Sequence, residues 1–183
     1  AYRRRQPYSF CPTNNTWGVD NRTVGLRVIL GNDTAVRVEK RDGSAADVAP
    51  GVTFETFDAA PFSQAVQALL TAKGFTAPSK IQQHAWPVAC AGKDAIAVAK
   101  TGSGKTLAFL LPILHRMEAA AASSDGFTAS SSIPEPDALI LAPTRELALQ
   151  IHAEADKFGA ATRASAVAVY GGAPMHKQKD ELT

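Results

Sequence analysis

The stretch Ala99-Lys100-Thr101-Gly102-Ser103-Gly104-Lys105-Thr106 decides the fold of this chain. It follows the pattern of a phosphate-binding loop, GxxxxGK[ST], except that alanine stands where the first glycine is usual. Gly102 and Gly104 allow the backbone to turn its N–H groups toward phosphate oxygens, and a helix beginning near Lys105 offers the same anion the positive end of its dipole. Lys105 brings a positive charge for the outer phosphates, and the Thr106 hydroxyl is suited to bind Mg²⁺. The stretch therefore predicts a nucleotide-binding loop.

The segments around the loop predict an α/β fold. Residues 94–98 are a short apolar run typical of a buried strand, and residues 106–118 continue as an apolar helix, which gives the order strand, loop, helix. The same alternation of short strands and helices extends along the chain, so we expect a parallel sheet with helices on both faces. The further elements expected are helices over 62–73, 79–91, 145–158 and from 174, and strands over 138–142 and 166–170.

Composition narrows the class of protein. The chain has 183 residues, of which 45% are hydrophobic and 20% are charged, as in ordinary globular domains. Its apolar runs are all shorter than the ~18 residues needed to cross a bilayer, so no membrane partner is expected. The two cysteines, Cys11 and Cys90, lie far apart without metal-ligand spacing, which favours an intracellular protein with reduced thiols. A net charge of +2 neither requires nor excludes a nucleic acid, and the oligomeric state is left open.

The chain divides into three parts. Residues 1–47 contain two β-like runs, 24–30 and 35–38, joined by a turn, and predict a hairpin. Residues 48–56 form a Pro-Gly junction, and residues 57–183 carry the α/β pattern, interrupted by a low-complexity surface loop over 119–136. The chain begins with Ala1 and ends without a terminating signal, so we expect both ends to be truncations.

Two further groups of residues suggest what the loop binds. Phe57 lies 17 residues before Gly74, which opens the segment Gly74-Phe75-Thr76-Ala77-Pro78-Ser79-Lys80-Ile81-Gln82. A glutamine amide can donate to and accept from an adenine edge, and an aromatic ring can stack on the base. Downstream, residues 142–148 end a strand and begin a helix, where backbone N–H groups and Arg145 can hold a phosphate.

With these motifs in order, residues 57–183 resemble the start of the first RecA-like domain of DEAD-box ATP-dependent RNA helicases. The segment ending at Gln82 resembles the Q motif of that family, residues 99–106 its Walker A motif, residues 143–148 its motif Ia, and Gly171-Gly172 its GG motif. The resemblance implies an ATP-hydrolysing enzyme that uses ATP and Mg²⁺, the latter held by Thr106, and that binds RNA. The implied ATP contacts are Phe57, Phe75, Lys80, Gln82, Thr101, Gly102, Ser103, Gly104, Lys105 and Thr106. The implied RNA contacts are Pro143, Thr144, Arg145, Gly171 and Gly172.

Structural readings of the same residues stay open. Phe57 and Phe75 would serve equally as core aromatics, and Gln82 as an exposed polar residue of a helix. Arg145 would then pair with Glu146 or Glu154 on a solvated face. Trp86 is interpreted as a core residue, and the histidines His84, His115, His152 and His176 as structural or exposed.

The Asp-Glu-Ala-Asp motif that the family uses for hydrolysis does not occur in the sequence, nor does a second RecA-like domain. The similar letters Asp180-Glu181 follow a polar helical run rather than a strand. Phosphoryl transfer needs a carboxylate to hold the metal and position water, together with an arginine finger. We therefore expect this polypeptide to bind ATP weakly and neither to hydrolyse it nor to unwind RNA.

Residues 1–47 resemble a different family, the catalytic domain of glutamine synthetase. The resemblance rests on residues 2–7, 17–27 and 38–41, and it stops before Val48, where the sequence departs from that family. It implies glutamate or phosphate contacts at Arg4 and Arg41, ATP contacts at Arg22 and Arg27, and a divalent metal at Glu39. An unrelated basic hairpin is the alternative for this region.

Three functions are weighed on this basis. The first is an ATP-binding and RNA-binding portion of a DEAD-box helicase, not catalytically competent as this fragment. The second is a glutamine synthetase (glutamate–ammonia ligase) fragment fused to it, and the third a non-enzymatic nucleotide-binding or RNA-binding module. The joining of two fragments near residues 48–51 is expected to explain the chain better than one coherent enzyme.

Overall fold

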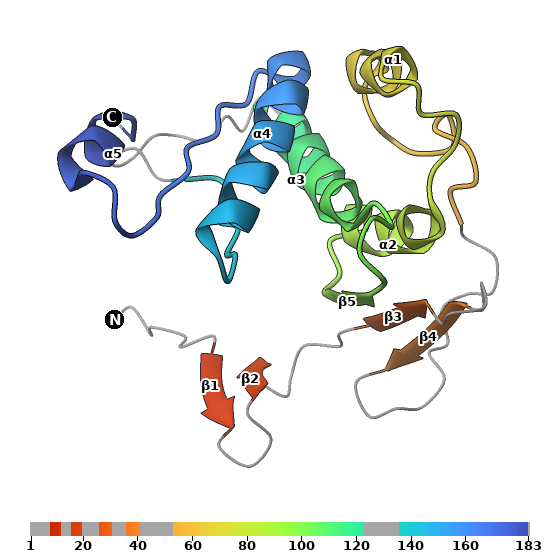
Figure 1. The fold of residues 1–183 in the computed structure, drawn as a ribbon. Coiled ribbons are helices and arrows are strands. Elements are labelled where there is room, and N and C mark those ends of the chain that lie inside the picture. The colour runs from red at the N-terminus through yellow and green to blue at the C-terminus, as the bar shows by residue number, and fades with distance from the viewer. Residues whose placement is uncertain are drawn as a thin grey trace, which may run out of the picture.

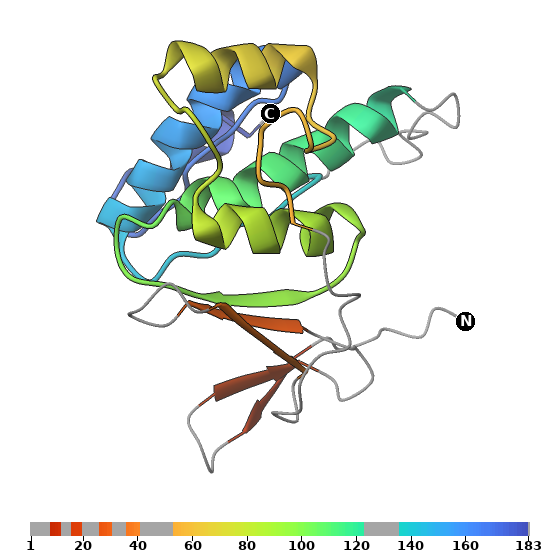
Figure 2. The same ribbon diagram turned by 90° about the vertical axis from the view of Figure 1, so that its right-hand side faces the viewer.

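The computed structural model of the chain describes residues 53–122 and 136–182, together with the backbone of strands nearer the N-terminus. Figures 1 and 2 show the arrangement from two sides. In chain order the elements are β1 (Tyr8–Cys11), β2 (Thr16–Val19), β3 (Leu26–Leu30), β4 (Val36–Lys40), α1 (Gln64–Ala72), α2 (Lys80–Cys90), β5 (Ala95–Val98), α3 (Lys105–Ala122), α4 (Arg145–Thr162) and α5 (Met175–Asp180).

The strand before the phosphate-binding loop belongs to a mixed sheet of three strands in the order β4-β3-β5. β3 and β4 form the antiparallel hairpin expected from the N-terminal sequence, with Leu26 opposite Lys40. β3 also pairs with β5 in parallel, with Leu26 opposite Ala95 and Ile29 opposite Val98. Parallel neighbours need a long crossover, which here passes through α1 and α2. The synthetase-like region therefore supplies the strand beside β5.

The structure differs from the expected sheet in two respects. In the described part of the chain, residues 138–142 and 166–170 have no regular secondary structure, and Leu139, Leu141 and Val169 are 79%, 84% and 61% exposed. A strand is stabilised only where a neighbour satisfies its backbone N–H and C=O groups. The described helices α1 to α4 also lie on one side of the three-stranded sheet rather than on both (Figures 1 and 2).

The helices begin and end at residues suited to those positions. Ser79 occupies the N-cap position of α2, where its backbone N–H donates to Oε1 of Gln82, and Thr144 caps α4 by accepting a hydrogen bond from the backbone N–H of Leu147 at 3.2 Å. Gly74 after α1 and Gly92 after α2 adopt the left-handed conformation that ends a helix, with φ of 81° and 70°. α3 and α4 run to Ala122 and Thr162, somewhat beyond the expected ends.

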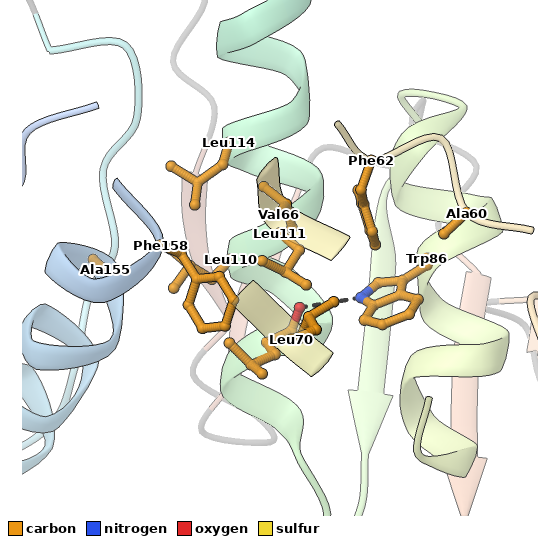
Figure 3. Packing of buried hydrophobic residues seen from close by; sticks show 11 residues of the cluster. Ala60, Phe62, Val66, Leu70, Trp86, Leu110, Leu111, Leu114, Ala155 and Phe158 are labelled. Carbon is orange, nitrogen blue, oxygen red and sulfur yellow. Dashed lines mark hydrogen bonds between the residues drawn. The ribbon is translucent and has the colours of Figure 1, made fainter. Parts of the chain in front are cut away.

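The buried core lies among the first four helices and runs from Trp86 to Phe158 (Figure 3). Trp86 is fully buried, as expected, and the edge of its ring meets Phe62 with centroids 4.9 Å apart. Its indole Nε1 donates to the backbone carbonyl of Leu107 at 3.1 Å, the dashed line in Figure 3. Because Leu107 stands in the first turn of α3, this bond joins α2 to the helix that leaves the phosphate-binding loop. The cluster comprises Ala60, Phe62, Val66, Leu70, Trp86, Leu107, Leu110, Leu111, Leu114, Ala155 and Phe158.

Candidate nucleotide-binding site

The phosphate-binding loop connects β5 to α3, as the sequence predicts. Gly102 and Gly104 have φ of 75° and 87°, a region that other L-residues enter only with strain. At Gly104 space is also lacking, since an ideal Cβ would stand 2.6 Å from Nε2 of Gln82. Glycine at position 104 is therefore required by both the backbone and the neighbouring side chain.

Lys105 reaches back into its own loop. Its Nζ donates to the backbone carbonyl oxygens of Ala99 and Lys100, both at 2.6 Å. Both acceptors belong to the loop, so the ammonium group lies against the loop backbone, and a phosphate there could accept the same hydrogen bonds. Thr106 follows in the first turn of α3 and is partly buried.

Gln82 lies against the loop rather than on an exposed face. Its side chain is buried, with Oε1 accepting from the backbone N–H of Ser79 at 2.9 Å and Nε2 donating to the carbonyl of Gly104 at 3.1 Å. The amide thus ties the first turn of α2 to the loop. An amide has two N–H donors and two acceptor directions, so one of each stays available to a ligand. That Gln82 reads adenine stays a prediction.

Two serine hydroxyls beside the loop have no hydrogen-bond partner within the described residues. The Oγ atoms of Ser79 and Ser103 are both buried from solvent. Buried hydroxyls are costly when unsatisfied, so such atoms mark a place where a polar ligand fits. The chemistry of this donor set, together with the two glycines and Lys105, is that of a site for a polyphosphate.

The two aromatic residues expected at the base lie together. Phe57 and Phe75 line one cavity of about 650 Å³ between α1 and the segments before and after it. Phe57 packs on Trp86 with ring centroids 6.3 Å apart, whereas Phe75 is 42% exposed. Lys80 is exposed and donates to Oε1 of Gln83 at 3.3 Å. The residues lining the cavity are Thr56, Phe57, Asp58, Gln64, Gln67, Ala68, Thr71, Gly74, Phe75 and Thr76.

A second group joins the start of α4 to the turn before α5. The guanidinium carbon of Arg145 lies 4.5 Å from the centre of the Tyr170 ring, a cation–π contact. This contact replaces the ion pairs considered for Arg145, and Glu154 pairs with Lys157 at 2.6 Å. The sequence analysis did not identify Tyr170 as a site residue. The only signal for it in the sequence was its position directly before the glycine pair.

Gln178 of α5 fixes the turn that carries the glycine pair. Its Oε1 accepts from the backbone N–H of Tyr170 at 2.8 Å, and its Nε2 donates to the carbonyl of Tyr170 at 3.2 Å. Gly172 in this turn has φ of 82°. Thr144, Arg145, Gly171 and Gly172 therefore come from two segments that the structure brings together, while Pro143 is exposed beside them.

The remaining titratable groups do not form a metal site in the described residues. Burial, followed by the charge of Lys80, lowers the pKa of His84 from 6.5. Burial raises the pKa of Cys90 to about 11. His152 connects α4 to the following segment, with Nε2 3.0 Å from the carbonyl oxygen of Ala166.

Only two of the synthetase-like residues fall on described strands. Arg27 of β3 stands opposite Glu39 of β4 in the hairpin register. The expected contacts at Arg4, Arg22 and Arg41 lie outside the described residues.

Together the strand, the glycine-bearing loop with its lysine and the helix that follows define a P-loop protein of the α/β class. Comparison with known proteins makes this specific. Residues 79–183 match the model of the DEAD/DEAH box helicase family. The chain belongs to that family. Residues 1–50 are similar to the catalytic domain of glutamine synthetase.

Similar proteins bear the same family names. An ATP-dependent RNA helicase, dbp2, of Emericella nidulans is 45% identical over 131 residues, which are 70% of this chain and 22% of that protein. The DEAD-box ATP-dependent RNA helicase 52A of Oryza sativa subsp. japonica is 43% identical over 143 residues, 76% of this chain and 23% of that protein. The chain thus spans about a fifth of the length of these relatives.

Solved structures agree on the fold. The crystal structure of the RNA helicase Prp28 from Chaetomium thermophilum bound to ADP superposes with a TM-score of 0.60 at 33% identity, over 72% of this chain and 30% of that one. A DEAD box protein from Methanococcus jannaschii gives a TM-score of 0.54 at 27% identity, over 72% of this chain and 33% of that one. The expected α/β, RecA-like class is confirmed. Among the described helices, none is long and apolar enough to cross a bilayer.

Proposed function

We propose that residues 57–183 form the ATP-binding and RNA-binding portion of an ATP-dependent RNA helicase. The observation that carries the proposal is the bond from Gln82 Nε2 to the Gly104 carbonyl, 3.1 Å long. It joins Gln82, the residue expected to contact the nucleotide base, to the loop expected to bind the phosphates. Because the two lie together, a single nucleotide could contact both.

In this proposal the loop N–H groups and Lys105 hold the phosphates, and Thr106 holds Mg²⁺. The support is the geometry of the loop: glycines at positive φ, and two buried serine hydroxyls that have no hydrogen-bond partner among the residues that the structure describes. Mg²⁺ would neutralise phosphate charge when bound. The chain's own residues would bind and orient the nucleotide, with Phe57 and Phe75 on the base side.

The experiment is a titration of the purified chain with fluorescent ATP and GTP analogues in the presence of Mg²⁺. We expect ATP to bind more tightly than GTP, and Lys105→Ala to weaken both by roughly tenfold or more, since a hydrogen-bonded charge contributes about 1.5–3 kcal/mol. Lys157→Ala, which removes an exposed lysine of α4, is the matched control. Equal affinities for ATP and GTP would contradict the assignment.

RNA would contact the group around Arg145. Its support is that the guanidinium and the glycine-pair turn lie together and exposed. Cross-linking of single-stranded RNA should fall with Arg145→Ala and stay unchanged with Arg163→Ala, an exposed arginine at the other end of α4. We further propose that this polypeptide does not hydrolyse ATP, and RNA-stimulated phosphate release from it would overturn that.

An intracellular location is a further proposal, supported by the free thiol of Cys90. The fusion of a synthetase fragment to a helicase fragment is likewise a proposal, supported by the two family matches on either side of residue 50. Sequencing the parent transcript across residues 48–51 tests it. A single reading frame that spans the join in independent samples would support a natural fusion.

A further inference from the structure

A proline inside α2 creates the place where the segment before α1 is attached. Pro87 has no backbone N–H, so the carbonyl of Gln83, four residues earlier, receives no hydrogen bond from position 87. The backbone N–H of Phe54 donates to this carbonyl at 3.1 Å. The Phe54–Gln83 hydrogen bond spans 29 positions of sequence. It uses a carbonyl that in an ordinary helix would accept from the N–H four residues later.

The attached segment carries a residue of the base cavity. Phe57 follows Phe54 by three positions, lines the cavity with Phe75, and packs on Trp86 one residue before Pro87. The carbonyl of Phe57 accepts from the N–H of Ala60 at 3.1 Å, which closes the turn leading to α1. Phe54 and Phe57 are both partly buried against the main core. The position of the Phe57 ring therefore depends on where residue 54 is held.

Gln83 is itself fixed, so its carbonyl is a rigid acceptor. Its side-chain Nε2 donates to the carbonyl of Pro78 at 2.9 Å, while Oε1 accepts from Lys80 Nζ at 3.3 Å. The neighbouring Gln82 is bonded to the phosphate-binding loop. Consecutive residues of α2 thus hold the loop on one side and the Phe57 segment on the other.

We propose that Pro87 is a positioning residue for the base side of the nucleotide site. Because Pro87 has no N–H, the Gln83 carbonyl is free to accept from Phe54. This bond fixes Phe57 in the cavity wall, at a set position relative to the loop that Gln82 contacts. The inference rests on the proposed function for its effect on ATP. Its structural half, the Phe54–Gln83 bond, stands independently of ATP.

The test compares Pro87→Ala with Pro112→Ala, which removes a proline from the interior of α3. Alanine at 87 restores a helical N–H that competes for the Gln83 carbonyl. We expect the hydrogen-exchange protection of the Phe54 amide to fall by at least about tenfold and ATP to bind about two- to tenfold more weakly, the range for one hydrogen bond. In Pro112→Ala, both quantities should stay within about twofold of the wild type, a change smaller than one such bond.

Thermal stability separates positioning from a general structural role. A helix-interior proline is unfavourable, so Pro87→Ala should melt at the same or a higher temperature while ATP affinity falls. A general loss of structure would instead lower both the melting temperature and the ATP affinity. Replacing Phe54 by its α-hydroxy acid, which removes only the N–H and keeps Pro87, should weaken ATP binding by a similar factor.

Unchanged Phe54 protection in Pro87→Ala would overturn the proposal, as would ATP affinity equal to that of Pro112→Ala. If the wild type does not prefer ATP to GTP, the proposed function fails and the effect on the base fails with it. The exchange data on Phe54 then still decide whether Pro87 positions the segment.

Discussion

The substitution Gly104→Ala tests how the phosphate-binding loop and α2 fit together. The new Cβ would stand 2.6 Å from Gln82 Nε2 and 3.0 Å from Ser79 Oγ. A glutamine end can often move aside, but here Gln82 is buried and both ends of its amide are bonded. Accommodating the methyl group therefore breaks those bonds, in addition to straining a residue at φ of 87°.

The magnitude follows from these contributions. Left-handed strain costs roughly 1–2 kcal/mol for a non-glycine residue. The two hydrogen bonds of the Gln82 amide contribute about 1 kcal/mol each, so the free energy of unfolding should fall by about 3–4 kcal/mol. Gly102→Ala is the matched control, because Gly102 has φ of 75° but no atom within 4 Å of the added Cβ. It should lose only the strain, about 1–2 kcal/mol.

The assay is urea unfolding combined with thermal melting of both variants and of Gln82→Ala. The difference of about 2 kcal/mol between the glycine variants corresponds to roughly 4–8 °C in Tm for a protein of this size. The double variant Gly104→Ala/Gln82→Ala should lose less unfolding free energy than the sum of the two single losses, as expected for residues in contact. Equal destabilisation of the two glycine variants, or strict additivity in the double variant, would refute the reasoning.

Three further predictions concern side chains outside the loop. Because burial raises the pKa of Cys90 to about 11, iodoacetamide at pH 8 should modify native Cys90 roughly ten- to a hundredfold more slowly than unfolded protein in a Cys11→Ser background; equal rates would contradict this. The pKa of His84 is lowered from 6.5, so stability tied to its neutral ring is present above pH 6.5 and lost as the pH falls through the lowered value. The urea midpoint should therefore drop more in the wild type than in His84→Gln between pH 7.5 and about pH 5. Gln178→Leu removes the bonds to both backbone groups of Tyr170, so RNA cross-linking should weaken while ATP affinity is retained; His176→Leu, which places a leucine at an exposed position of the same helix, serves as the control.

Local patterns predicted the helices and the loop well, because their determinants lie close together in sequence. Ser79 and Thr144 stand at the N-cap positions of the expected helices, and Trp86 is fully buried in the core. The strands were predicted less well, since pairing depends on partners far along the chain. Residues 138–142 have a strand-like sequence but pair with no strand among the described residues. β5, in contrast, pairs with β3, which lies far before it in the sequence.

The site shows the same division. The chemistry of an amide and an aromatic ring, together with the resemblance to the Q motif, suggested that Gln82, Phe57 and Phe75 lie near the nucleotide. The structure puts Gln82 on the loop and both aromatic rings in one cavity wall. Their roles toward ATP stay predictions. The contacts of Arg145 with Tyr170 and of Phe54 with Gln83 depend on three-dimensional packing, which no local spacing reveals.

The two short bonds from Lys105 to the carbonyls of Ala99 and Lys100 make binding at this loop an exchange. An incoming anion gains only the difference between its own attraction for the ammonium and that of the two carbonyls it replaces. A single phosphate gains little binding free energy from this difference. A chain of phosphates gains more, because it makes additional contacts along the loop. By this reasoning, the exchange at Lys105 should favour a polyphosphate chain over a single small anion.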